Sequence, residues 1–158
     1  MQETLLEGNL KNERAVEGLR KQSVRRLSEH GHKQNALTIA KFLLASTVES
    51  NISNSYKEDL IFTLCKLSNQ VGKNFKDFDR EDVLSFLDSN RKTEPKDPLH
   101  GWIGSYNLHR GFIVKFFRWL YYPDVKPTDR PKPDCIENIP NLKKKGKEHL
   151  QAHRSMDR

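Results

Sequence analysis

Two basic side chains and one amide lie on one strip of the most aromatic segment of the chain. Residues 101–123 read GWIGSYNLHRGFIVKFFRWLYYP. At about 100° per residue, Asn107, Lys115 and Arg118 fall within roughly a quarter-turn of one another. An ammonium and a guanidinium can neutralise phosphate oxygens, and an amide can pair with the edges of bases. The strip therefore predicts contacts with nucleic acid, and the alternative is that it is simply the solvated side of a core helix.

Two glycines lie on the same strip. Gly104 and Gly111 should each lower helix propensity by about 1 kcal/mol relative to alanine. Without a Cβ, each also allows another backbone to come close.

Other candidate contacts are basic and amide side chains in three further places. A helix and its end supply Lys57, Lys66, Asn69 and Lys73, a loop supplies Arg91 and Lys92, and a C-terminal basic run supplies Lys143, Lys144 and Lys145. Each of these side chains could reach a phosphate group. The alternatives are an ordinary solvated helix face and a solubilising tail.

The chain offers no convincing catalytic or metal-binding set. His149 and His153 have the i, i+4 spacing of two metal ligands on one helix face, but no second pair of ligands accompanies them. Neither cysteine has a histidine partner for nucleophilic catalysis, and Tyr121 and Tyr122 are expected to be structural. We expect no catalytic residue, no metal, no cofactor and no small-molecule substrate.

Composition favours a polyanionic partner. The 158 residues carry a net charge of +7 with 31% charged and 35% apolar residues. Residues 143–158 hold six basic side chains against two acids, so much of the excess belongs to a tail. With two cysteines in unlike regions and no apolar run near the ~20 residues of a membrane span, we expect a cytoplasmic protein without membrane attachment.

Hydrophobic periodicity predicts five helices and no strand. The expected helices cover about residues 12–28, 34–48, 56–71, 79–90 and 101–121. Gly72 should end the third helix, and Asp79 should cap the fourth. The buried face of the last helix should contain Ile103, Tyr106, Ile113, Val114, Phe117, Leu120 and Tyr121, with Leu108, Phe112, Phe116 and Trp119 on its flank. The fold class is therefore all-α.

Three stretches together resemble one known family. They are KNFKDFDREDVLSFLDSNRK, DPLHGWIGSYNLHRGFIVKFFRWLYYPD and RPKPDCIENIPNLKKK. Over roughly residues 50–145 the chain resembles the N-terminal core-binding domain of archaeal integrases, which are tyrosine recombinases of mobile elements. The resemblance implies a compact SAM-like domain of four or five helices that clamps one face of double-stranded DNA. It also implies association with the nucleoid and contact with other integrase protomers.

This resemblance divides the chain into three expected parts. Residues 1–50 would be a helical extension, residues 51–123 the core-binding domain, and residues 124–158 an extended proline-rich linker with a basic tail. In that family a downstream domain supplies the arginines, lysine, histidines and tyrosine that cleave DNA, and we find no such set here. We therefore expect DNA binding for recombination without cleavage by this chain.

The alternative is a small helical interaction protein that regulates a full-length integrase by protein contact. The basic run Arg20, Lys21, Arg25 and Arg26 would suit a partner interface. We expect no membrane attachment through this run, because its apolar face is thin and lacks aromatic side chains.

Overall fold

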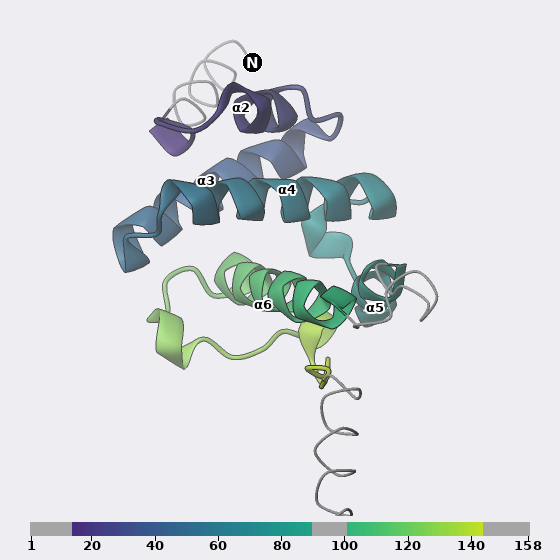
Figure 1. The fold of residues 1–158 in the computed structure, drawn as a ribbon. Coiled ribbons are helices and arrows are strands. Elements are labelled where there is room, and N and C mark those ends of the chain that lie inside the picture. Colours follow the sequence, from purple (N-terminus) through teal and green to yellow (C-terminus); the bar gives the residue numbers. More distant parts are fainter. Residues whose placement is uncertain (1–13, 90–100, 144–158) are drawn as a thin grey trace, which may run out of the picture.

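The computed structural model describes residues 14–89 and 101–143, and these residues form five α-helices without a strand. The helices are α2 (Lys21–Ser28), α3 (Lys33–Ser50), α4 (Asn54–Val71), α5 (Arg80–Ser89) and α6 (Gly101–Tyr121) (Figure 1). Three short 3-10 turns accompany them: η1 (Phe75–Asp77), η2 (Pro127–Asp129) and η3 (Asp134–Ile136). The all-α prediction is confirmed.

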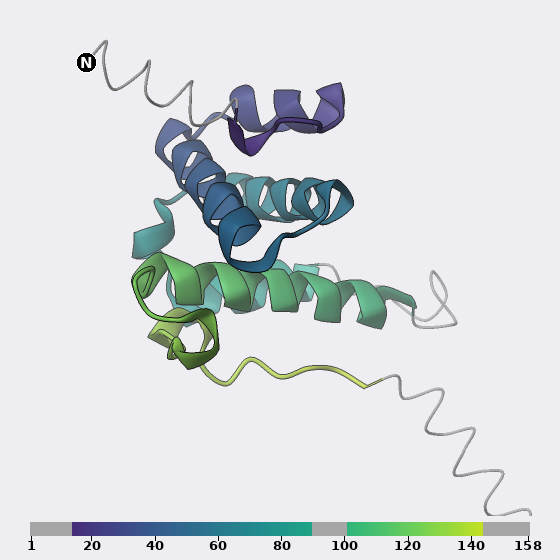
Figure 2. The same cartoon turned by 90° about the vertical axis from the view of Figure 1, so that its left-hand side faces the viewer.

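The helices are stacked in layers, in the same vertical order in both ribbon views. Helix α2 lies over α4, α3 and α4 form the middle layer, and α6 lies beneath them with α5 near its N-terminal end (Figures 1 and 2). The chain then turns back after α6, and residues 122–143 run beneath this helix toward its beginning. We call residues 122–143 the C-terminal strap.

Local capping explains where several helices begin and end. The Ser53 hydroxyl accepts a hydrogen bond from the Tyr56 N–H at the start of α4, and Gly72 ends that helix at a φ of +73°. At α5 the Asp79 carboxylate accepts from the Asp82 N–H at 2.8 Å, and the Asp82 carboxylate accepts from the Asp79 N–H at 3.0 Å. This reciprocal pair is a capping box, so the predicted cap at Asp79 is confirmed.

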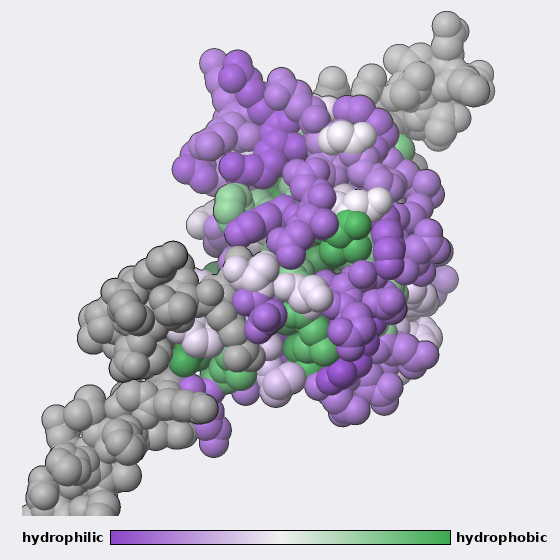
Figure 3. Space-filling model, turned by 90° about the vertical axis from the view of Figure 1, so that its right-hand side faces the viewer, coloured by the Kyte–Doolittle hydropathy of each residue, from purple (hydrophilic) through white to green (hydrophobic). Residues whose placement is uncertain are grey.

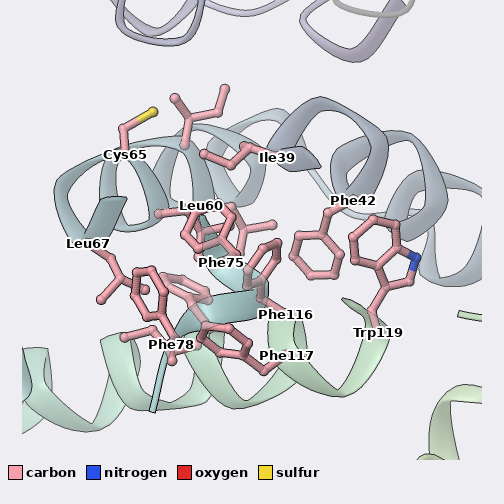
Figure 4. Close-up of a cluster of buried hydrophobic side chains, with 14 of the residues drawn as sticks. Ile39, Phe42, Leu60, Cys65, Leu67, Phe75, Phe78, Phe116, Phe117 and Trp119 are labelled. Atoms are coloured by element: carbon pink, nitrogen blue, oxygen red, sulfur yellow. The ribbon is translucent and has the colours of Figure 1, made fainter. Parts of the chain in front are cut away.

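Aromatic side chains from three parts of the chain form the centre of the core (Figure 4). The ring centroid of Phe42 on α3 lies 5.3 Å from that of Phe116 and 5.2 Å from that of Trp119, both on α6. Phe75 of η1 packs against Phe116 at 4.7 Å. The contacts of Phe116 with Phe42 and Phe75 are edge-to-face, and such contacts add to the stabilisation that comes from burying the rings. The aromatic face of α6 is therefore the surface on which α3 and η1 pack.

One buried amide holds the connection between α4 and α5. Asn35 of α3 is fully buried, and its side chain donates to the Ser68 hydroxyl at 2.8 Å and to the Lys73 carbonyl at 2.7 Å. Its carbonyl oxygen accepts from the Phe75 N–H at 3.1 Å. Because the amide satisfies two backbone groups, it fixes the path of the chain into η1.

Some sequence expectations were wrong at the edges of helices. The single helix expected over 12–28 is interrupted, since Gly18 has a φ of +81° and α2 begins only at Lys21. Leu108 and Tyr121 were expected in the core, yet they are 51% and 39% exposed. The Tyr121 hydroxyl lies at the surface and donates to the Lys76 carbonyl.

The hydrophobic core crosses both predicted part boundaries. Leu27, before residue 50, and Ile136 and Ile139, after residue 123, belong to the same buried cluster as the residues of α4, α5 and α6. The strap does not lead away as a linker would, because η3 packs against α5 and α6. The described residues on both sides of each boundary therefore share one core.

Candidate nucleic-acid interface

The strap occupies part of the predicted polar strip of α6. The Asn107 amide donates to the Leu142 carbonyl at 2.8 Å and accepts from the Leu142 N–H at 2.9 Å. Arg118 donates through Nε to the Arg130 carbonyl at 2.7 Å and through Nη2 to the Pro127 and Arg130 carbonyls. Both side chains anchor the strap, and a DNA contact by either of them stays a prediction.

The glycines of the strip do not serve helix packing among the described residues. A Cβ built at Gly104 or at Gly111 would meet no other atom within 4 Å. Within the described residues, no other segment of backbone lies against either glycine. Both positions remain open to solvent along the exposed ridge of α6.

Lys115 is the member of the strip whose charge stays available. Its ammonium lies 5.4 Å from the centroid of the Tyr56 ring, and no carboxylate among the described residues pairs with it. Tyr56 in turn packs edge-on against Phe112 at 5.1 Å. The cation–π contact orients the lysine and leaves its N–H donors for an anion.

A second basic surface lies across α2 and α4. Phe62 is 41% exposed, and the Arg26 guanidinium carbon and the Lys66 ammonium lie 4.7 and 5.9 Å from its ring centroid. Asn69 is exposed one turn further along α4, on the same side as Phe62 and Lys66. We call Arg26, Phe62, Lys66 and Asn69 the α2–α4 face.

Helix α2 is held firmly against α4 at this surface. The Glu58 carboxylate accepts from the Arg20 backbone N–H, the Arg20 Nε and the Ser23 hydroxyl, each at 2.9 Å. These hydrogen bonds lower the pKa of the Glu58 carboxyl below its usual value, the bond from the Arg20 backbone N–H most of all. The carboxylate therefore stays charged and supports the orientation of the α2 cations.

The remaining predicted contacts are differently placed. Lys73 pairs with Asp82 at 2.9 Å, which raises the pKa of the lysine, and Lys57 is buried. Lys143 is exposed at the end of the described strap. Arg91, Lys92, Lys144 and Lys145 lie outside the described residues. Lys73 is therefore engaged by an ion pair and Lys57 by burial, whereas Lys143 is exposed to solvent.

The surface at the α5 end of the molecule is mainly polar. Figure 3 shows hydrophilic side chains over most of the described atoms on that side, with smaller apolar areas between them. None of the described helices is long and apolar enough to cross a membrane.

Burial shifts the pKa of both cysteines and of one histidine in the described part of the chain. Burial raises the pKa of the Cys65 thiol to about 12 and that of the Cys135 thiol to about 11, which keeps both protonated and unreactive. Burial, followed by the nearby Lys66 charge, lowers the pKa of His109. No cluster of three potential metal ligands occurs among the described residues, and His149 and His153 lie outside them.

Comparison with known proteins gives no relative from which a function could be transferred. No protein-family model, curated protein or solved structure matches the chain. The function of this chain is therefore inferred from its residues and their geometry.

Sequence reasoning missed Arg110 and Arg130, which lie near the predicted strip. Arg110 donates to the Ile139 carbonyl at 2.7 Å, and Arg130 pairs with Glu49 at 2.8 Å. The available signal was the apolar spacing of Ile136, Ile139 and Leu142 in the proline-rich segment, which indicates a segment that packs on the helices rather than a free linker.

Proposed function

We propose that this chain binds duplex DNA, as the core-binding domain of a site-specific tyrosine recombinase does, and we assign no cleavage step to it. The observation that carries the proposal is the α2–α4 face, where Arg26 and Lys66 flank the exposed Phe62 ring. Cations held beside an exposed aromatic ring suit a surface that meets phosphates and bases together. The resemblance of residues 50–145 to integrase core-binding domains gives the proposal its biological setting.

The construction of the face supports this role. Arg26 and Lys66 come from two helices that Glu58 links through Arg20 and Ser23. A surface on packed helices holds its charges at fixed separations, which a regular phosphate backbone requires. Lys115 on α6 offers a further cation, and Asn69 an amide that can reach a base edge or a phosphate.

Fluorescence anisotropy with a labelled duplex at two salt concentrations tests the proposal. The double variant Arg26→Gln, Lys66→Gln should bind the duplex at least about tenfold more weakly. Its plot of log K against log salt should be shallower by about 0.9 for each phosphate that the variant no longer neutralises. Lys115→Gln measured alone reports whether α6 contributes to the same complex.

The matched control is Lys33→Gln, Lys41→Gln, which removes the same charge from exposed positions on α3. It should retain the parental affinity and slope to within the small effect of net charge. If both double variants lost the same affinity for the duplex, the binding would be unspecific electrostatic attraction. That result would refute the assignment of the α2–α4 face. Absence of salt-dependent binding by the parent chain would refute the proposed function.

A further inference from the structure

The strap and α6 border an open pocket of about 250 Å³ whose polar side chains are all cationic. Arg110, Lys115 and Arg118 of α6 and Arg130 of the strap line it, and no carboxylate does. Gly111 contributes to the same lining. From this arrangement we infer that the pocket binds one phosphate group, either a free phosphate or phosphomonoester or a phosphate of a nucleic acid backbone.

The cations are held in place by backbone carbonyls. Arg110 donates through Nε to Ile139, and Arg118 donates through Nε and Nη2 to strap carbonyls. Both Nη atoms of Arg110 and Nη1 of Arg118 have no hydrogen-bond acceptor in the described part of the chain. Two guanidinium groups are thus oriented by the fold and still have donors for an oxyanion.

The charge balance of the pocket favours a multiply charged anion. Glu49 pairs with Arg130, and among the described residues no acid pairs with Arg110, Lys115 or Arg118. Three like charges gathered around one cavity repel one another, and an anion placed between them removes that repulsion. Phosphate suits the site because the two Nη groups of Arg110 can bind two of its oxygens in a parallel pair of hydrogen bonds, and Nη1 of Arg118 can add a further one.

The size of the pocket limits the ligand. Its volume lies just below the range of cavities that hold drug-sized molecules, so it fits a phosphate group with a small ester substituent. A Cβ at Gly111 would meet no atom within 4 Å, so the space above the helix at this point is open. Pro127 and Val114 supply apolar lining for the carbon side of an ester.

The ligand would join two segments that are far apart in the sequence. Lys115 and Arg118 belong to α6, whereas Arg130 belongs to the strap that returns beneath it (Figures 1 and 2). A phosphate that contacts both segments should stabilise the docked strap, because it binds the folded protein and not the unfolded chain. This inference stands independently of the proposed DNA-binding function.

The test is a thermal-shift and calorimetric titration of the full chain with sodium phosphate, against sodium chloride at matched ionic strength. Phosphate should raise the melting temperature in a saturable way and chloride should not. Lys115→Gln should weaken phosphate binding at least about tenfold, and Lys132→Gln, at an exposed strap position outside the pocket lining, should leave it unchanged. Gly111→Glu provides a second variant, because a carboxylate at that site would compete with phosphate. The substitution also raises the helix propensity of α6, since it replaces a glycine.

A parent chain that shows no phosphate-specific saturable shift would overturn the inference. Equal phosphate affinities in the parent, Lys115→Gln and Gly111→Glu would do the same. If phosphate displaces a bound duplex at matched ionic strength, and Lys115→Gln weakens both ligands, the pocket takes a backbone phosphate. If phosphate binds without displacing the duplex, or if no duplex binds at all, the pocket serves a free phosphate or phosphomonoester, and the two proposals are separated.

Discussion

Replacing Arg130 with methionine should destabilise the fold by about 2–4 kcal/mol. The Arg130 side chain is 4% exposed and donates to both carboxylate oxygens of Glu49, at 2.8 and 3.2 Å. It also donates to the carbonyls of Tyr122 and Pro123 at 2.9 and 3.1 Å. Methionine keeps much of the apolar stem but removes every one of these donors.

The magnitude follows from the number of bonds and from the exposure of the partner. Hydrogen bonds to charged groups contribute about 1.5–3 kcal/mol each, and losing one partner of a buried ion pair costs about 3–5 kcal/mol. The Glu49 side chain is 28% exposed, so water can partly solvate its carboxylate after the arginine is removed. This partial solvation limits the expected loss in the free energy of unfolding to about 2–4 kcal/mol.

Urea unfolding followed by tryptophan fluorescence would measure the effect, since Trp119 lies in the core beside Phe42. Combined with Glu49→Gln in a double-mutant cycle, the pair should show a coupling energy of about 1–3 kcal/mol. Lys132→Met, at an exposed position of the strap, is the control and should change stability by no more than about 0.5 kcal/mol. An unchanged free energy of unfolding for Arg130→Met would refute the role of the Arg130–Glu49 pair in holding the strap against α3. Additive effects of the Arg130→Met and Glu49→Gln substitutions would refute it as well.

Three further predictions concern the buried polar groups. Asn35→Ala should cost about 2–4 kcal/mol in urea unfolding, because it leaves two backbone groups of the η1 connection without their partner; a cost below about 1 kcal/mol would contradict that role. Burial holds the pKa of His30 below its ordinary 6.5. As the pH falls, this histidine therefore takes up a proton at a higher pH in the unfolded chain than in the folded protein. The free energy of unfolding should therefore have its full value above about pH 6.5 and decrease as the pH drops below it. The free energy of unfolding of the His30→Gln variant should decrease less steeply over the same range. Cys65 and Cys135 should react with a thiol reagent only when the protein unfolds, and rapid labelling of the native protein would show that these thiols are not buried.

The helices could be predicted because their signals are local. Ser53, Gly72 and Asp79 act on backbone groups within a few residues of themselves, so their roles are visible in the sequence. The aromatic face of α6 was equally readable, since burial follows a period of 3.6 residues. The errors fell at its edges, where Leu108 and Tyr121 lie at the boundary between core and solvent.

The candidate sites were only partly predictable. Lys66, Asn69 and Lys115 were identified as basic or amide groups on exposed helix faces, and their side chains do lie at or near the surface. The pairing of Arg26 with Phe62 joins residues of two helices, and no periodicity within one helix reports it.

By itself the sequence determined the all-α class of the described residues, the approximate bounds of α3, α4, α5 and α6, and the helix faces that enter the core. Only the tertiary structure decided which polar side chains of α6 remain available. Asn107, Arg110 and Arg118 bond to strap carbonyls 9–35 residues away. Every residue carries a carbonyl group, so an acceptor of this kind leaves no mark in the sequence, and only the path of the folded chain brings it to its donor.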